Sequence, residues 1–246
     1  MKNIDQWIPS KFIFKHNKLV ANRDVNEVSL SSRMMADIIA FLYSKYIPVY
    51  CKGKLIDLGC GKVPLYHVYK NFIEENVCVD WPNSNHKSNH IDFECNLNEA
   101  LPFNTNIFDT IILSDVLEHI YSPQLLWQEM YRILKKDGFL LMNIPFYYWI
   151  HEEPNDYYRY TRYAIEKFAL ESGFKIIEIT PLGGIPEILT DINCKFYAQI
   201  PYIGKIMSEL IRIKSKLFLK TFLGKKISKS TAEKFPLGYF VIAKKQ

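Results

Sequence analysis

The sequence predicts an α/β protein built on a mostly parallel sheet. Two observations lead to this class. Short apolar runs with the character of buried strands alternate with segments whose apolar residues recur at helical spacing. One such run, ending at Asp57, leads directly into two closely spaced glycines. Strands that alternate with helices form βαβ units, and sheets of this kind bind ligands at the carboxyl ends of their strands.

The expected elements follow in chain order from this alternation and from residues that end helices and strands. Strands are expected at residues 54–57, 77–80, 91–94, 108–113, 139–144, 174–179 and 238–243. Helices are expected at residues 31–46, 65–75, 123–134 and 163–172. We expect Pro48 to end the first helix, residues 135–138 to form a turn and Gly173 to close the last helix. Residues 1–30 show no clear period.

A basic amphipathic helix is predicted over residues 202–223, where apolar residues recur at helical spacing and lysines fall largely between them. It either lies on an anionic membrane surface as a peripheral contact or packs on the protein as a lid with its lysines in water. We expect a single domain in three parts. These are a helical extension at residues 1–50, a core at residues 55–182 and 237–246, and this basic insertion or lid at residues 183–236.

Composition limits the classes of function. The 246 residues, 48% of them hydrophobic, provide for a sizeable core. The net charge of +5 is too small to indicate a nucleic acid partner. The five cysteines contain no CxxC pair, which favours reduced thiols and a cytoplasmic location. No uncharged apolar run reaches the roughly 20 residues of a membrane-spanning helix.

The glycine loop that follows Asp57 is the main candidate ligand site. Glycines let the backbone approach a ligand closely, and Asp80 ends the next expected strand, where an acid typically accepts hydrogen bonds from ribose hydroxyls. A dinucleotide site would have a third glycine in a GxGxxG pattern, but lysine, valine and proline follow Gly61 here. The acid before the loop would also repel a pyrophosphate, so a nucleotide-dependent oxidoreductase is disfavoured.

Several ordered motifs carry a family resemblance. They are LIDLGCG at residues 55–61, Asp80, LPF at 101–103, FD at 108–109, SDVLEH at 114–119 and LKKDG at 134–138. With them the chain resembles the class I S-adenosylmethionine-dependent methyltransferases, and it is most similar to their type 11-like, small-molecule group. The resemblance implies a Rossmann-like three-layer sandwich, with a seven-stranded sheet that is mostly parallel, an antiparallel last strand and a helical insertion before that strand.

The resemblance also implies a site for S-adenosylmethionine, from which S-adenosylhomocysteine would be the product. The amino-acid part of the cofactor would lie on the glycine loop, and its ribose would bind Asp80 at the end of the second strand. Its adenine would lie near Trp81, Asn96 and Leu97. The implied cofactor-binding residues are Asp57, Gly59, Cys60, Gly61, Asp80, Trp81, Asn96, Leu97 and Ser114. In the family, the residue at the position of Asn96 is often an aspartate that contacts the adenine amino group. Asp92 is the alternative candidate for this contact.

Candidates for acting on the acceptor lie at residues 151–161, a polar and aromatic stretch after the strand at 139–144. The stretch resembles a segment found in a subgroup of these enzymes near sugar or cell-surface biosynthesis. His151 is a candidate base that Asp156 would orient. Arg159 either binds a phosphate or carboxylate of the acceptor or pairs with Asp156 to brace the loop.

Three further residues complete the candidate site. Tyr157 and Tyr160 are candidates for binding the acceptor, and His119 is either a base or part of a pair that orders its loop. The two acids that follow His151 do not predict a metal site, because adjacent residues rarely share one ion.

The sequence therefore predicts a methyltransferase that acts on a small molecule, such as a sugar or a lipid-linked biosynthetic intermediate, by in-line transfer. The alternative is a non-catalytic S-adenosylmethionine-binding or interaction module.

Overall fold

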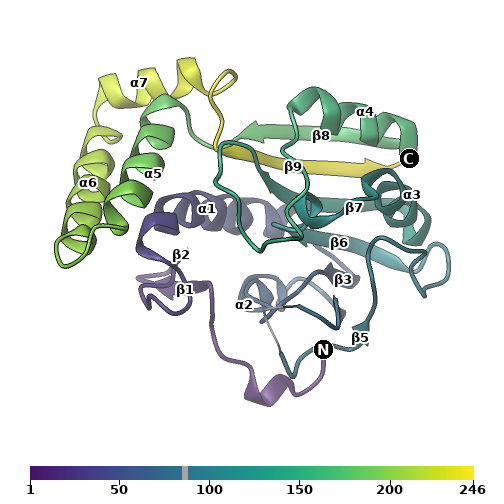
Figure 1. Cartoon of the computed structure of the whole chain (residues 1–246). Coiled ribbons are helices and arrows are strands. Elements are labelled where there is room, and N and C mark those ends of the chain that lie inside the picture. The colour runs from purple at the N-terminus through teal and green to yellow at the C-terminus, as the bar shows by residue number, and fades with distance from the viewer. Residues whose placement is uncertain (85–87) are drawn as a thin grey trace. The chain divides into compact units, whose positions relative to one another are not determined.

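The computed structural model describes residues 1–84 and 88–246 (Figure 1). They form two compact units. The first contains residues 1–9, 45–180 and 239–246, and the second contains residues 10–44 and 181–238. The divisions fall within helix α1 (Arg33–Tyr50), at the end of strand β8 (Phe174–Pro181) and at the start of strand β9 (Gly238–Lys245).

A seven-stranded sheet with the spatial order β5-β4-β3-β6-β7-β9-β8 forms the first unit. The remaining strands are β3 (Lys54–Leu58), β4 (Glu75–Asp80), β5 (Phe93–Glu94), β6 (Phe108–Ser114) and β7 (Leu134–Pro145). Parallel pairing links β5 to β4, β4 to β3, β3 to β6 and β6 to β7, whereas Figure 1 shows β9 running opposite to β8. The predicted mostly parallel sheet with an antiparallel last strand is confirmed.

Burial explains why the central strands read as continuous apolar runs. Leu55, Ile56 and Leu58 of β3 are fully buried, as expected for parallel strands that are covered on both faces. Helices α2 (Tyr66–Tyr69), α3 (Pro123–Ile133) and α4 (Arg162–Ser172) belong to the same unit. The hydroxyl of Thr161 caps α4 by accepting from the amide of Ala164, and Gly173 ends α4 in the left-handed region, as predicted.

Three local predictions are wrong. The turn expected at residues 135–138 lies inside β7, where the pairing with β6 shifts register and Asp137 has a φ of 63°. A bulge absorbs the turn-forming residues without ending the strand. The helix expected over residues 65–75 is limited to α2, because β4 already begins at Glu75. Helix α1 runs past Pro48 to Tyr50, since a proline near the last turn removes only one of its backbone hydrogen bonds.

The second unit combines a hairpin with three helices. Strands β1 (Phe12–Lys15) and β2 (Lys18–Ala21) meet at His16 and Asn17, both with positive φ, the geometry of a tight hairpin turn. The predicted helix at residues 202–223 is divided between α6 (Gly204–Phe218) and α7 (Phe222–Thr231), and α5 (Ile185–Ala198) lies beside α6 (Figure 1). Among the described residues, no helix combines the length and the apolar character that crossing a membrane requires.

Short 3₁₀ turns complete the secondary structure. They are η1 (Ile4–Gln6), η2 (Leu30–Ser32) and η3 (Leu117–His119). The last follows β6 directly and begins the loop that carries the SDVLEH motif.

The FD and LPF motifs have structural roles. Asp109 lies near the start of β6, where its carboxylate accepts from the amide of Lys54 and pairs with Lys135 at 2.7 Å. The LPF segment is held from α3. Glu129 accepts from the amide of Leu101 at 2.7 Å, and Arg132 donates to the carbonyl of Phe103 at 2.6 Å. Both motifs therefore fix the sheet and its connections rather than line its carboxyl edge.

Replacing Glu129 with alanine should destabilise the first unit. The change removes the acceptor for the buried Leu101 amide and for Arg132, and hydrogen bonds to charged groups contribute about 2 kcal/mol each. Urea unfolding followed by circular dichroism should show a lower midpoint. Glu171→Ala, in an exposed ion pair, should leave the midpoint nearly unchanged, and equal midpoints for both variants would contradict the anchoring role.

Candidate active site at the carboxyl edge of the sheet

The glycine loop after β3 is held in a shape that only glycine adopts easily. Gly59 and Gly61 have φ values of 72° and 50°, in the left-handed region. A Cβ on Gly59 would lie 2.5 Å from Val116, which follows β6. The amides of Gly59 and Cys60 donate to the carbonyl of Val79 in β4, at 2.8 and 3.0 Å. The loop is thus fixed to the end of β4 and touches the loop after β6.

The two expected acids lie at the ends of adjacent strands. Asp80 accepts from the amide of Gly61 at 2.9 Å and from that of Trp81 at 2.7 Å. Asp57 is buried and accepts from the hydroxyl of Tyr69 at 3.4 Å. Burial and the nearby charge of Asp80 raise the pKa of Asp57 to about 7. The hydrogen bond from Tyr69 lowers this pKa, but by less. An acid with this pKa is ready to ionise when a cation approaches.

The residues expected near an adenine have mixed surroundings. The side-chain oxygen of Asn96 accepts from the amide of Asn98 at 3.1 Å and closes a turn. Asp92, the alternative candidate for the adenine contact, accepts from the amide of Cys78 and pairs with the N-terminal ammonium at 2.7 Å. Both side chains therefore have structural partners. Leu97 and Cys60 are buried, whereas Trp81, at the end of β4, is 37% exposed.

An N-terminal tryptophan lies against the glycine loop, which the sequence pattern did not reveal. The indole of Trp7 donates to the carbonyl of Val63 at 3.1 Å, and its ring meets the edges of Tyr66 and His67. Residues 1–9 thus pack beside the start of α2. A lone tryptophan in a segment without a period gives no signal of this contact.

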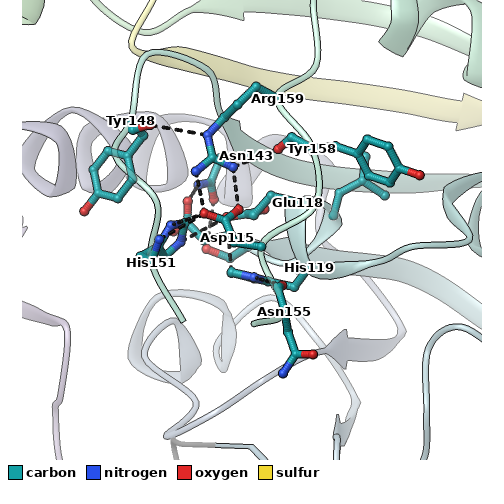
Figure 2. A network of polar contacts seen from close by, with 12 residues as sticks. Asp115, Glu118, His119, Asn143, Tyr148, His151, Asn155, Tyr158 and Arg159 are labelled. Carbon is teal, nitrogen blue, oxygen red and sulfur yellow. Dashed lines mark hydrogen bonds and ion pairs between the residues drawn. The ribbon is translucent and has the colours of Figure 1, made fainter. Parts of the chain in front are cut away.

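Residues 151–160 are anchored on the loop that follows β6 (Figure 2). The amide of Tyr157 donates to the carbonyl of Glu118 at 2.9 Å. The hydroxyl of Tyr160 donates to the carbonyl of Leu117 at 3.2 Å, and Nδ1 of His119 lies 2.7 Å from the carbonyl of Asn155. These bonds join the two segments that the sequence singled out separately.

Strands β6 and β7 are also joined at this edge. Ser114 donates to the side-chain oxygen of Asn143 at 2.8 Å, and the amide nitrogen of Asn143 donates to Asp115. Ser114 therefore lies at the carboxyl edge, as expected, but its hydroxyl is engaged by β7.

Asp156 and Arg159 form a two-pronged ion pair. The guanidinium nitrogens of Arg159 contact both carboxylate oxygens of Asp156, at 2.5 and 2.7 Å. Burial acts to raise the pKa of Asp156, but the hydrogen bonds from Arg159 and from the His151 amide lower it to about 2. Of the two roles considered for Arg159, the structure shows the bracing one.

Two histidines and a carboxylate converge beside this pair (Figure 2). Nδ1 of His151 lies 3.2 Å from Asp156, the expected partner of a candidate base. Nε2 of His151 and Nε2 of His119 lie 3.8 and 3.7 Å from the same oxygen of Glu118, whose side chain is fully buried. Burial, together with the nearby His119, lowers the pKa of His151 and favours its neutral form. Glu118 thus belongs to the candidate site.

The two candidate tyrosines differ in position. Tyr160 is 4% exposed and packs in the hydrophobic core against Phe168, so its place is structural. Tyr157 is 43% exposed and donates to the side chain of Asn155. Tyr157 remains accessible to an acceptor.

Comparisons with known proteins agree with this architecture. Residues 56–142 match the family described as methyltransferase domain. An S-adenosylmethionine-dependent methyltransferase from Archaeoglobus fulgidus has a TM-score of 0.55 at 16% identity, over 87% of this chain and 94% of that chain. The [4+2]-cyclase SpnF has a TM-score of 0.55 at 16% identity, over 87% and 82% of the two chains.

A third structure is phosphoethanolamine N-methyltransferase 2 of Haemonchus contortus in complex with S-adenosyl-L-methionine. It has a TM-score of 0.54 at 18% identity, over 91% of this chain and 58% of that chain. A comparison with curated protein sequences finds no match. At these identities the likenesses establish the fold, and a cyclase among them shows that one fold serves different reactions.

The matched segment contains the glycine loop, both acids, the SDVLEH motif and the start of β7, on a sheet with the expected strand order. Residues 56–142 therefore match a methyltransferase domain, and the sheet around them has the fold of S-adenosylmethionine-dependent methyltransferases.

Proposed function

We propose that this chain binds S-adenosylmethionine on the glycine loop and methylates a hydroxyl group of a small, lipid-linked molecule. The observation that carries the proposal is the glycine loop itself. It joins the buried Asp57 and Asp80 at the ends of neighbouring strands and lies against the loop that holds His119. When bound, the cofactor supplies an electrophilic methyl group on a sulfonium.

The residues of the loop fit this cofactor. The positive φ of Gly59 and Gly61 leaves the backbone amides without side chains above them, which gives room for the amino-acid part. Asp57 is the acid that would face its ammonium group, and Asp80 offers carboxylate oxygens for ribose hydroxyls. Trp81, partly exposed beside Asp80, provides an aromatic surface for the adenine. One structural neighbour is a complex with S-adenosyl-L-methionine, which supports the same cofactor here.

The acceptor would bind at the cluster formed by Glu118, His119 and His151. His151 is the candidate that takes the hydroxyl proton, because its lowered pKa favours the neutral form and its Nδ1 faces Asp156 and the carbonyl of Trp149. Tyr157 is the exposed aromatic side chain at this edge and would contact the acceptor. Positioning these groups beside the methyl donor lowers the barrier by holding the reacting atoms together.

The exposed surface of α6 (Gly204–Phe218) suits a peripheral membrane contact, which would accompany a lipid-linked acceptor. In α6 the buried residues are Gly204 and Ser208, whereas the apolar stripe formed by Ile206, Leu210, Ile213 and Leu217 is 42–63% exposed. Exposed lysines at positions 205, 214, 216 and 220 accompany this stripe. An apolar face accompanied by cations suits the interface of an anionic bilayer. The exposed stripe thus favours the peripheral membrane contact over a lid whose apolar face is packed.

The direct test of the reaction uses cofactor labelled in its methyl group. Incubation of the protein with labelled S-adenosylmethionine and a lipid extract should transfer label to an organic-soluble product. His151→Ala should lower that rate by about 10²–10⁴-fold while leaving cofactor affinity unchanged. Cofactor binding without transfer to any extract fraction would support the non-catalytic binding module instead.

The affinity for S-adenosylhomocysteine should depend on pH. Because the pKa of Asp57 is raised to about 7, its carboxylate is mostly protonated below pH 7 and must lose a proton to pair with the ligand ammonium. Calorimetry should show affinity falling by up to about tenfold per pH unit as pH is lowered from 7 to 5. Asp57→Asn should bind more weakly with no such slope, and Glu74→Gln should keep it. A slope retained in Asp57→Asn would refute this role.

The membrane contact can be tested by sedimentation with vesicles. Vesicles containing phosphatidylglycerol should bind the protein, and binding should weaken with salt and with neutral lipid. Replacing Ile206 and Leu210 together with aspartate should reduce binding at least about tenfold, because apolar burial is lost and repulsion is added. Leu170→Asp, on exposed α4, is the matched control. Equal binding by both variants would rule out the α6 surface.

A further inference from the structure

The cluster at residues 118, 119 and 151 has the form of a metal site. One ligand atom from each of Glu118, His119 and His151 lies within 4.8 Å of the other two. Nε2 of each histidine lies 3.7 or 3.8 Å from one Glu118 oxygen, which is longer than a hydrogen bond. Ligands about 2.1 Å from a shared ion lie about 3–4 Å apart. The two distances to Glu118 thus fit ligands of one shared ion, and the two histidine nitrogens, within 4.8 Å of each other, would move slightly closer around it.

Each imidazole is oriented through its other nitrogen. Nδ1 of His119 lies 2.7 Å from the carbonyl of Asn155, so this nitrogen carries the proton and Nε2 presents its lone pair. Nδ1 of His151 lies 3.3 Å from the carbonyl of Trp149 and 3.2 Å from Asp156, two acceptors that have the same effect. Metal-bound histidines characteristically donate their second ring nitrogen to a carbonyl or a carboxylate in this way.

The surroundings of the cluster hold these partners in place. Asp156 is fixed by both guanidinium nitrogens of Arg159 and by the backbone amide of His151. Two residues after Asn155, the amide of Tyr157 donates to the carbonyl of Glu118 and so fixes this part of the loop. The Glu118 side chain is fully buried, and a cation beside it would offset the cost of burying a carboxylate. His119 and His151 have side chains 15% and 23% exposed, so one side of the cluster is open to an acceptor.

We propose that Glu118, His119 and His151 bind a divalent transition-metal ion of the zinc or cobalt type, with open positions for the oxygen of the methyl acceptor. Two nitrogens and one carboxylate favour such an ion over Mg²⁺, which prefers oxygen ligands.

The role of the ion in binding the acceptor rests on the proposed function, whereas the binding of the ion by these three residues does not. An acceptor hydroxyl bound to the ion becomes more acidic and loses its proton to water or buffer. Its oxygen then forms the new bond to carbon while the sulfonium sulfur keeps the pair of the broken bond. With the ion in place, His151 acts as a ligand and the ion takes over the activation otherwise assigned to this residue.

The test is a titration of metal-free protein with Co²⁺, followed by visible absorption and calorimetry. We expect one tight site, not blocked by millimolar Mg²⁺ and displaced by Zn²⁺. His119→Ala and His151→Ala should abolish the cobalt bands, and His67→Ala, an exposed histidine on α2, should retain them. Asp156→Asn should weaken metal binding by about 10–100-fold, because it changes the partner that orients His151.

Affinity for S-adenosylhomocysteine, measured in the same variants, separates the two proposals. Retained cofactor binding with lost cobalt bands shows that the variants fold and that the metal site is distinct. Glu118→Gln, which preserves shape, should weaken metal binding at least tenfold. An absence of stoichiometric binding, or cobalt bands unchanged in both histidine variants, would overturn the metal site without affecting the proposed cofactor site.

Discussion

The approach of Gly59 to Val116 is the constraint on which the carboxyl edge of the sheet depends. A side chain on Gly59 would meet Val116 at 2.5 Å, so the loops after β3 and β6 can touch only because one of them lacks a Cβ. Parallel strands bring their carboxyl ends to one edge, but they do not make the loops at that edge meet. This contact places the proposed methyl-donor loop directly beside the SDVLEH motif, which begins the proposed acceptor site.

The acceptor side is assembled by backbone hydrogen bonds rather than by proximity in sequence. Glu118 and His119 follow β6, and His151 follows β7. The carbonyl of Glu118 accepts from the amide of Tyr157, and this bond holds residues 151–160 over η3. The same segment supplies the carbonyl and the carboxylate that orient the two imidazoles. The ion pair of Asp156 and Arg159 therefore stabilises the site although neither side chain need touch the acceptor.

Much of the fold could be predicted because parallel strands, buried on both faces, leave short apolar runs that are easily seen. The glycine loop, Asp80 and the end of α4 at Gly173 follow from local chemistry in the same way. The bulge in β7 could not be predicted, because residues 135–138 have the composition of a turn and the strand continues only through the pairing of Leu134 and Phe139 with β6. The β1–β2 hairpin was missed because its strands lie in a segment without a clear period.

The site was predictable only in part. The sequence identified His151, Asp156 and Arg159 as one cluster, but it left the role of Arg159 open and gave Glu118–His119 no partner. Their convergence depends on how two loops dock, which no spacing in the sequence encodes. The proposed metal site could not be predicted for this reason, since the acids next to His151 in the sequence are residues 152 and 153, while the carboxylate that faces it comes from another strand end.

The most direct test of the account is a crystal structure of the protein with S-adenosylhomocysteine. We predict the amino-acid part of the ligand on residues 59–61 and its ribose at Asp80. We predict its sulfur directed toward the side of the cluster on which His119 and His151 are exposed. A ligand bound elsewhere, or with its sulfur directed away from this cluster, would contradict the claim that the glycine loop presents a methyl group to this edge of the sheet.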